Sequence, residues 1–149
     1  MTEFYVMITT VSFNISDKAK AEHAFTIRRI VFVEEQMVSR EEEYDSFEEI
    51  ATHYLALVDD VPGGTARWRV TDNGVKLERF AVLPSFRNQG VGATLVNTVL
   101  KDVLPLQKKI YLHSQVSAMN LYAKAGFVPE GELFYEANIP HYKMVYKGA

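Results

Sequence analysis

The chain has 149 residues, of which 48% are hydrophobic and 23% charged, and its formal net charge is −3. This balance is ordinary for a globular protein and predicts one domain over residues 1–149 that buries its core without covalent cross-links. The small negative charge excludes an overall basic field for nucleic acid. The sequence contains no cysteine, which excludes disulfides, thiolate metal sites and a cysteine acyl-enzyme.

Membrane insertion and secretion also find no support in the residue pattern. No stretch approaches the roughly 20 apolar residues of a membrane span. Residues 1–13 are apolar, but they carry an early acid and no basic region, which is unlike a signal peptide. We therefore expect a cytoplasmic protein without a membrane or nucleic-acid partner.

The first third of the chain predicts a strand, an amphipathic helix and a polar segment. Residues 3–13 are rich in β-branched and aromatic side chains, which is typical of a strand. Ser16 is the predicted N-cap of a helix over 17–36, where apolar side chains recur at helical spacing. Segment 39–50 is acidic and predicts a loop or short helix. Its acids are expected in solvent, with a metal or substrate role as the alternative.

The rest of the chain predicts an antiparallel meander followed by alternating helices and strands. Pro105 stops one helix, and Gly126 ends a second, shorter helix in the position of a left-handed cap. The β-α-βββ-α-β-α-ββ order implies a mixed sheet with one parallel pair. The predicted strands are 53–59, 64–70, 75–83, 108–115 and two within 131–147, and the helices are 91–104 and 117–126.

The turn after the meander carries Arg87, Gly90 and Gly92 just before a helix. A helix N-terminus exposes unpaired N–H groups with a partial positive charge, and glycines let an anion approach them. The pattern therefore predicts a phosphate or pyrophosphate cradle, with a tight turn that binds nothing as the alternative. A P-loop would need a lysine after Gly92, and a Rossmann turn would need glycine where Leu95 stands.

At this turn the sequence resembles the GCN5-related N-acetyltransferases. Five ordered blocks over nearly the whole chain resemble the small bacterial ElaA/YjcF-like acyltransferases. The resemblance implies an α/β fold of the α+β kind, a single N-acetyltransferase domain. Its mostly antiparallel mixed sheet would have six or seven strands and one splayed pair, flanked by four helices. The blocks are RRIVFVEEQMV, ARWRV, KLERFAVLPSFRNQGVG, QVSAMNLYAKAGF and ANIPHYKM, and the family signature Gln/Arg-x-x-Gly-x-Gly/Ala is matched by Arg87, Asn88, Gln89, Gly90, Val91 and Gly92.

The resemblance also implies acetyl-CoA (coenzyme A) as cofactor, with its pyrophosphate over residues 87–92. The pantetheine arm would pair with the main chain of Phe80, Ala81 and Val82, where a backbone N–H would face the thioester oxygen. These three residues also suit an ordinary strand core. Gln115 stands where many relatives have asparagine and is a further expected cofactor contact.

Acyl transfer to an amine needs a proton acceptor for the amine and a proton donor for the thiolate. By resemblance Tyr122 is the general acid and His141 the base, with Glu78 competing for the base role through a water molecule. The alternatives are a core tyrosine, a hydrogen-bonded histidine in a turn and a salt-bridged strand glutamate. The four histidines show no metal-ligand spacing, so no metal is expected; the other three are His23, His53 and His113.

Several arginines match the same blocks. Arg67 and Arg69 alternate with Trp68, so the two arginines are predicted on one strand face and the indole on the other. They are expected to line the acceptor pocket or, together with Arg28, to pair with acids. The candidate acids are Glu34, Glu35 and Glu43.

The expected function is acetyl-CoA-dependent N-acetyltransferase activity, with direct transfer of the acyl group to a primary amine of a small molecule. Two alternatives stay open: a non-catalytic acyl-CoA-binding or sensing module, and a protein N-acetyltransferase. The residue pattern leaves the acceptor and the oligomeric state open, with a homodimer as one expected assembly.

Overall fold

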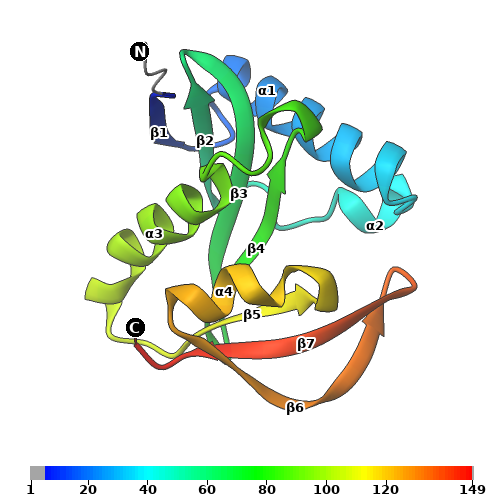
Figure 1. Cartoon of the computed structure of the whole chain (residues 1–149), viewed down its shortest axis with the longest axis vertical. Coiled ribbons are helices and arrows are strands. Elements are labelled where there is room, and N and C mark those ends of the chain that lie inside the picture. Colours follow the sequence, from blue (N-terminus) through cyan, green and yellow to red (C-terminus); the bar gives the residue numbers. More distant parts are fainter. Residues whose placement is uncertain (1–5, 149) are drawn as a thin grey trace, which may run out of the picture.

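The structure is a computed structural model and describes residues 6–148. Its strands form one sheet in the order β1-β2-β3-β4-β5-β7-β6 (Figure 1). Among the described residues, β4 and β5 are the one pair of parallel neighbours, which confirms the mixed sheet with one parallel pair. The strands are β1 (Ile8–Phe13), β2 (Thr52–Val58), β3 (Val61–Thr71), β4 (Gly74–Val82), β5 (Ile110–Gln115), β6 (Phe127–Glu136) and β7 (Ile139–Tyr146). Residues 3–5 of the predicted first strand lie outside the described residues.

The helices separate onto the two faces of the sheet. Tyr54 and Ala56 of β2 face a core cluster built with α3 and α4, whereas Leu55 between them faces the cluster that contains α1. This alternation follows from the two-residue period of a strand. Among the described residues, no helix combines the length and apolar character needed to cross a bilayer. The helices are α1 (Lys18–Arg28), α2 (Arg40–Glu43), α3 (Val91–Val103) and α4 (Met119–Ala125).

The helix predicted over 17–36 differs from the structure at both ends. Asp17, not Ser16, is the N-cap, because the Asp17 carboxylate accepts a hydrogen bond from the Lys20 amide at 3.3 Å. After Arg28 the helix widens into a π-helix, η1 (Arg29–Glu35). Such π segments are rare and occur frequently at functional sites.

Other helix ends agree with their sequence signals. α3 ends at Val103, one turn containing Pro105 follows it, and Gly126 closes α4 with φ of +109°. That positive φ explains the glycine. The remaining short turns are 3₁₀ segments, namely η2 (Pro84–Phe86), η3 (Leu104–Leu106) and η4 (Val116–Ala118).

The parallel pair diverges soon after it forms. β4 and β5 are in register only from Val75–Ile110 to Leu77–Leu112, after which each strand continues without the other. The two strands can be followed apart from their shared end in Figure 1. The predicted splayed pair is therefore confirmed, and the space between the strands holds the candidate site.

Candidate active site

A groove of about 1100 Å³ occupies the space between the diverging strands. Its walls come from β4, η1, the turn before α3, α4, and the facing ends of β5 and β7. All ten predicted cofactor contacts except Gln89 line this groove, as do the three predicted catalytic residues. The topology thus brings together predicted catalytic residues that are distant in the sequence. Glu78 and His141, for example, are 63 positions apart.

The glycine turn presents the N-terminus of α3 to the groove. Gly90 is the N-cap with φ of +86°, and a Cβ atom there would meet nothing within 4 Å. The first backbone hydrogen bond of the helix runs from Thr94 to Gly90 at 3.0 Å, and no side chain caps the preceding amides. These amides are therefore free to donate hydrogen bonds to an anion.

Gly92 has a different physical role from the one its motif suggests. A Cβ at Gly92 would lie 3.3 Å from Leu121 Cδ2, which is closer than ordinary van der Waals contact. Gly92 therefore lets α3 and α4 pack closely. The open space at this turn lies at Gly90 instead.

The charge of Arg87 is already paired. Its guanidinium donates two hydrogen bonds to the Glu35 carboxylate, at 2.6 and 2.7 Å, and a third to the Val82 carbonyl at 2.9 Å. The Arg87 hydrogen bond lowers the pKa of Glu35, which stays ionised. Arg87 thus joins η1 to the end of β4, and the expected free positive charge at the turn is offset by an acid.

The predicted pantetheine segment lies on the part of β4 that β5 leaves. Ala81 and Val82 pair with β3 on their other side. A bulge precedes them, with Arg79 at φ of +58°, so the strand bends where the register with β3 shifts. The Val82 carbonyl accepts from Arg87, whereas Phe80 contributes its ring to the groove wall.

Tyr122 of α4 is a buried side chain at the groove. Its ring packs edge-on against Phe80 and Phe127, with centroids 5.7 and 6.1 Å away. Burial raises the pKa of the phenol, which therefore carries its proton at neutral pH. Among the described residues, the hydroxyl makes no hydrogen bond, so its proton is available to a ligand in the groove.

A backbone carbonyl group determines the tautomer of His141 on β7. Its Nδ1 lies 2.7 Å from the Ile139 carbonyl oxygen, which can only accept, so Nδ1 carries the hydrogen. In the neutral ring the Nε2 atom is then the free base. The side chain is buried, and its ring stacks on Phe134.

Glu78 has surroundings that oppose a base role. Its carboxylate accepts hydrogen bonds from Arg67 and Arg69 at 2.8 and 3.0 Å, and Lys76 Nζ lies 3.3 Å away. Burial alone would raise its pKa, but these cations lower it to about 2. A carboxylate that holds its proton so weakly at neutral pH is a poor acceptor for an amine proton.

Glu78 belongs to a larger buried ion network, of which the sequence suggested only an Arg28–Glu43 pair and a salt-bridged Glu78. Arg67, fully buried, also binds Asp45 and Glu48, and Arg28 binds Glu48 and Glu43. The acids of segment 39–50 were expected in solvent, which is wrong for Glu43 and Glu48. The reason is that α1 and β3 bring Arg28 and Arg67 beneath this segment. The expected pairing of Arg28 with Glu43 is confirmed.

The predicted faces of β3 are also confirmed, since Arg67 and Arg69 lie on the face opposite Trp68. The Trp68 indole N–H donates a hydrogen bond to the Tyr54 hydroxyl.

Gln115 at the end of β5 donates a hydrogen bond to Gln36 at 2.8 Å. Gln36 follows η1, and both amides line the groove. Two successive residues of one segment therefore contact the turn before α3, through Glu35, and the end of β5, through Gln36.

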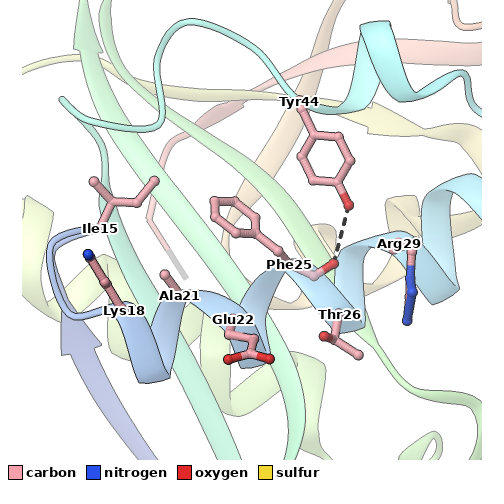
Figure 2. Close-up of a pocket in the computed structure, with 8 residues that line it drawn as sticks. All are labelled: Ile15, Lys18, Ala21, Glu22, Phe25, Thr26, Arg29 and Tyr44. Atoms are coloured by element: carbon pink, nitrogen blue, oxygen red, sulfur yellow. Dashed lines mark hydrogen bonds between the residues drawn. The ribbon is translucent and has the colours of Figure 1, made fainter.

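The described residues contain no metal-ligand cluster, and a second depression lies away from the groove. Among the described residues, no group of three or more histidine and acidic side chains is arranged to hold a metal ion. A shallower depression of about 490 Å³ lies over α1, as Figure 2 shows, where Tyr44 donates a long hydrogen bond to the Phe25 carbonyl. It contains none of the predicted site residues.

The fold is that of known acetyltransferases. The crystal structure of Escherichia coli ElaA, 25% identical in sequence, superposes with a TM-score of 0.84 over 95% of this chain and 100% of that one. A GNAT family acetyltransferase from Elizabethkingia anophelis, solved with acetyl-CoA bound, is 19% identical and superposes with a TM-score of 0.66 over 93% and 94% of the two chains.

The sequence comparisons assign the family. The family model of the acetyltransferase (GNAT) domain matches residues 17–147. The uncharacterized N-acetyltransferase YjcF of Bacillus subtilis is 35% identical over 131 residues, which cover 87% of this chain and 94% of YjcF. The chain belongs to the GNAT acetyltransferase family, whose members use acetyl-CoA, and the resemblance stated from the sequence is confirmed.

Proposed function

We propose that this chain is an acetyl-CoA-dependent N-acetyltransferase that transfers the acyl group directly to the primary amine of a small molecule. One observation carries the proposal. A single groove is lined by the glycine turn, the free stretch of β4, Tyr122 and His141. An anion site, a pairing edge, a proton donor and a proton acceptor therefore face the same space.

The residues of the groove fit coenzyme A. The uncapped amides after Gly90 suit the pyrophosphate, and the open space at the Gly90 Cα leaves room for it. The stretch Phe80–Val82 suits the pantetheine arm, with Arg87 already holding the last carbonyl of that stretch. Gln115 is a further polar contact at the end of β5. When bound, acetyl-CoA would supply the acyl group as an activated thioester.

The proton transfers follow from the two side chains. His141 Nε2 accepts the amine proton, because its Nδ1 hydrogen is held by the Ile139 carbonyl. Tyr122 donates its proton to the departing sulfur, because burial keeps the phenol protonated. Glu78 is assigned to the ion network instead, since two arginines and a lysine surround it.

Replacement of Gly90 by glutamate is expected to abolish acetyl-CoA binding. The new carboxylate would occupy the space beside the exposed amides and repel the pyrophosphate. Calorimetric titration with acetyl-CoA measures the effect. Gly131→Glu is a matched control, because Gly131 has the same φ of +86° and the same open surroundings but lies on β6. Both variants suffer similar backbone strain, and only Gly90→Glu is expected to lose binding. Equal affinities in the two variants would remove the pyrophosphate from this turn.

Initial-rate kinetics with a panel of primary amines is expected to give intersecting double-reciprocal lines. The chain has no cysteine to hold an acyl group, and direct transfer requires acetyl-CoA and the amine to be bound together. Parallel lines with a trapped acyl-enzyme would contradict direct transfer. Tight acetyl-CoA binding without turnover of any small amine would contradict the proposed function and point to a binding module or a protein acceptor.

A further inference from the structure

The carboxylate of Glu136, which the proton transfers above leave unused, lies between two histidines at the groove. Its Oε1 atom is 2.8 Å from His113 Nδ1 on β5, and its Oε2 atom is 4.0 Å from His141 Nε2 on β7. All three side chains line the groove. This cluster could not be predicted from the sequence, because its members lie on three separate strands.

The backbone holds Glu136 in this place. It is the last residue of β6 and pairs with Ile139, the first residue of β7. The two residues between them, Ala137 and Asn138, have φ of +50° and +62°, which is the geometry of a tight hairpin turn. The same Ile139 provides the carbonyl that determines the His141 tautomer. The turn therefore positions the carboxylate and the base together.

An aromatic ring supports both histidines. The Phe134 ring stacks on His141 at 5.8 Å and meets His113 edge-on at 5.0 Å. Phe134 thus helps to hold both imidazole rings near the Glu136 carboxylate.

The Glu136 carboxylate stays ionised with one oxygen free. The hydrogen bond from His113 is the main cause that lowers its pKa, and Lys76 and His141 add to it. These are the charged and titratable groups that face it, from β5, β4 and β7. Lys76 is itself paired with Glu78. Among the described residues, Oε2 accepts no hydrogen bond, and it faces the Nε2 atom that would receive the amine proton.

We propose that Glu136 binds the ammonium group of the acceptor and presents it to His141. This inference rests on the proposed function and names its substrate class, a cationic primary amine. One ammonium N–H donates a hydrogen bond to Glu136 Oε2. Another ammonium proton, the first that the nitrogen loses, passes to His141 Nε2. The imidazolium that forms lies beside the Glu136 anion, which stabilises it.

The remaining steps balance atoms and charge. The freed nitrogen lone pair forms the bond to the thioester carbon, and the carbon–sulfur bond breaks with its electron pair on sulfur. Tyr122 gives its proton to the sulfur. The second proton that the nitrogen loses restores the Tyr122 hydroxyl through solvent, and His141 releases its proton to solvent.

The test replaces Glu136 by glutamine, which keeps the shape and removes the charge. For alkylamines that are cationic at neutral pH, KM is expected to rise at least about tenfold, because a charge-assisted hydrogen bond is lost. The value of kcat is expected to fall much less than KM rises, because Tyr122 and His141 both remain in place. Glu130→Gln is the control: Glu130 is on the same strand, pairs with Lys109 and Lys143, and is absent from the groove wall. Equal KM values in the two variants would overturn the inference.

A second measurement needs no turnover. Addition of propylammonium chloride to the coenzyme A complex is expected to shift the NMR signals of the His141 ring in the wild type and in Glu130→Gln, but not in Glu136→Gln. Shifts of equal size in all three proteins, or in none, would overturn the role of Glu136. Failure of the wild type to acetylate any amine would instead count against the proposed function.

Discussion

Replacement of Tyr122 by phenylalanine is expected to lower kcat by at least about tenfold while leaving acetyl-CoA affinity nearly unchanged. General acid catalysis typically contributes about 10²–10⁴-fold, and water would replace part of it. The variant loses only a hydroxyl that has no hydrogen-bond partner among the described residues, and the ring keeps its contacts with Phe80 and Phe127. The thioester sulfur would lie in the same desolvated surroundings, which also raise the proton affinity of a thiolate.

Pre-steady-state turnover measures the effect on the chemical step, and calorimetry measures the effect on acetyl-CoA affinity. Tyr135→Phe is the matched control, since Tyr135 is 68% exposed and absent from the groove wall. It is expected to keep full activity. A Tyr122→Phe enzyme with unchanged kcat under conditions where chemistry limits the rate would contradict the proton-donor role. A large loss of acetyl-CoA affinity would show that the hydroxyl acts in binding.

Replacement of Arg67 by methionine is expected to destabilise the fold by about 3–5 kcal/mol, the usual cost of leaving buried charges without their partner. Arg67 is fully buried and joins Asp45, Glu48 and Glu78. Methionine fills similar space but leaves these three acids with fewer cations. Chemical denaturation measures the change in the free energy of unfolding. The same substitution at the exposed Arg40 should change it little.

The same network predicts loss of stability at acid pH. Arginine contacts lower the pKa of Asp45 and of Glu78 to about 2, from ordinary values of 3.8 and 4.5. The unfolded chain therefore takes up protons first as the pH falls. The stability from these pairs is complete above about pH 4.5 and is lost as the pH falls toward 2. Equal free energies of unfolding for Arg67→Met and Arg40→Met at pH 7 would contradict the stabilising role of this ion network.

The periodic elements were predictable because their signals are local. The alternation in β2 to β4, the i+4 apolar repeat of α3 and the glycine after α4 each report on neighbours within a few residues. The errors have local causes too. Ser16 and Asp17 are both good N-caps, and only the hydrogen bond to Lys20 distinguishes them. The π-helix has no sequence signal in the chain, because its apolar spacing resembles that of an α-helix.

The candidate site was predictable only where one motif carries it. The Arg-x-x-Gly-x-Gly turn can be found in the sequence, since uncapped amides and a positive φ need glycine at that place. The pairing of Arg87 with Glu35 could not be found, because it joins residues 52 positions apart. The same holds for Glu136, which sequence reasoning passed over and which reaches His113 only through the order of β5, β7 and β6.

The sequence by itself determined the order of strands and helices, the family and the glycine turn, because these depend on residue type and short-range spacing. Only the tertiary structure decided which charges are free. It buried Glu43 and Glu48 under two arginines, surrounded Glu78 with cations, and left His141 Nε2 and one oxygen of Glu136 facing the groove. The physical reason is that the protonation and availability of a group depend on its burial and on its partners in space, and both arise only when distant segments pack together.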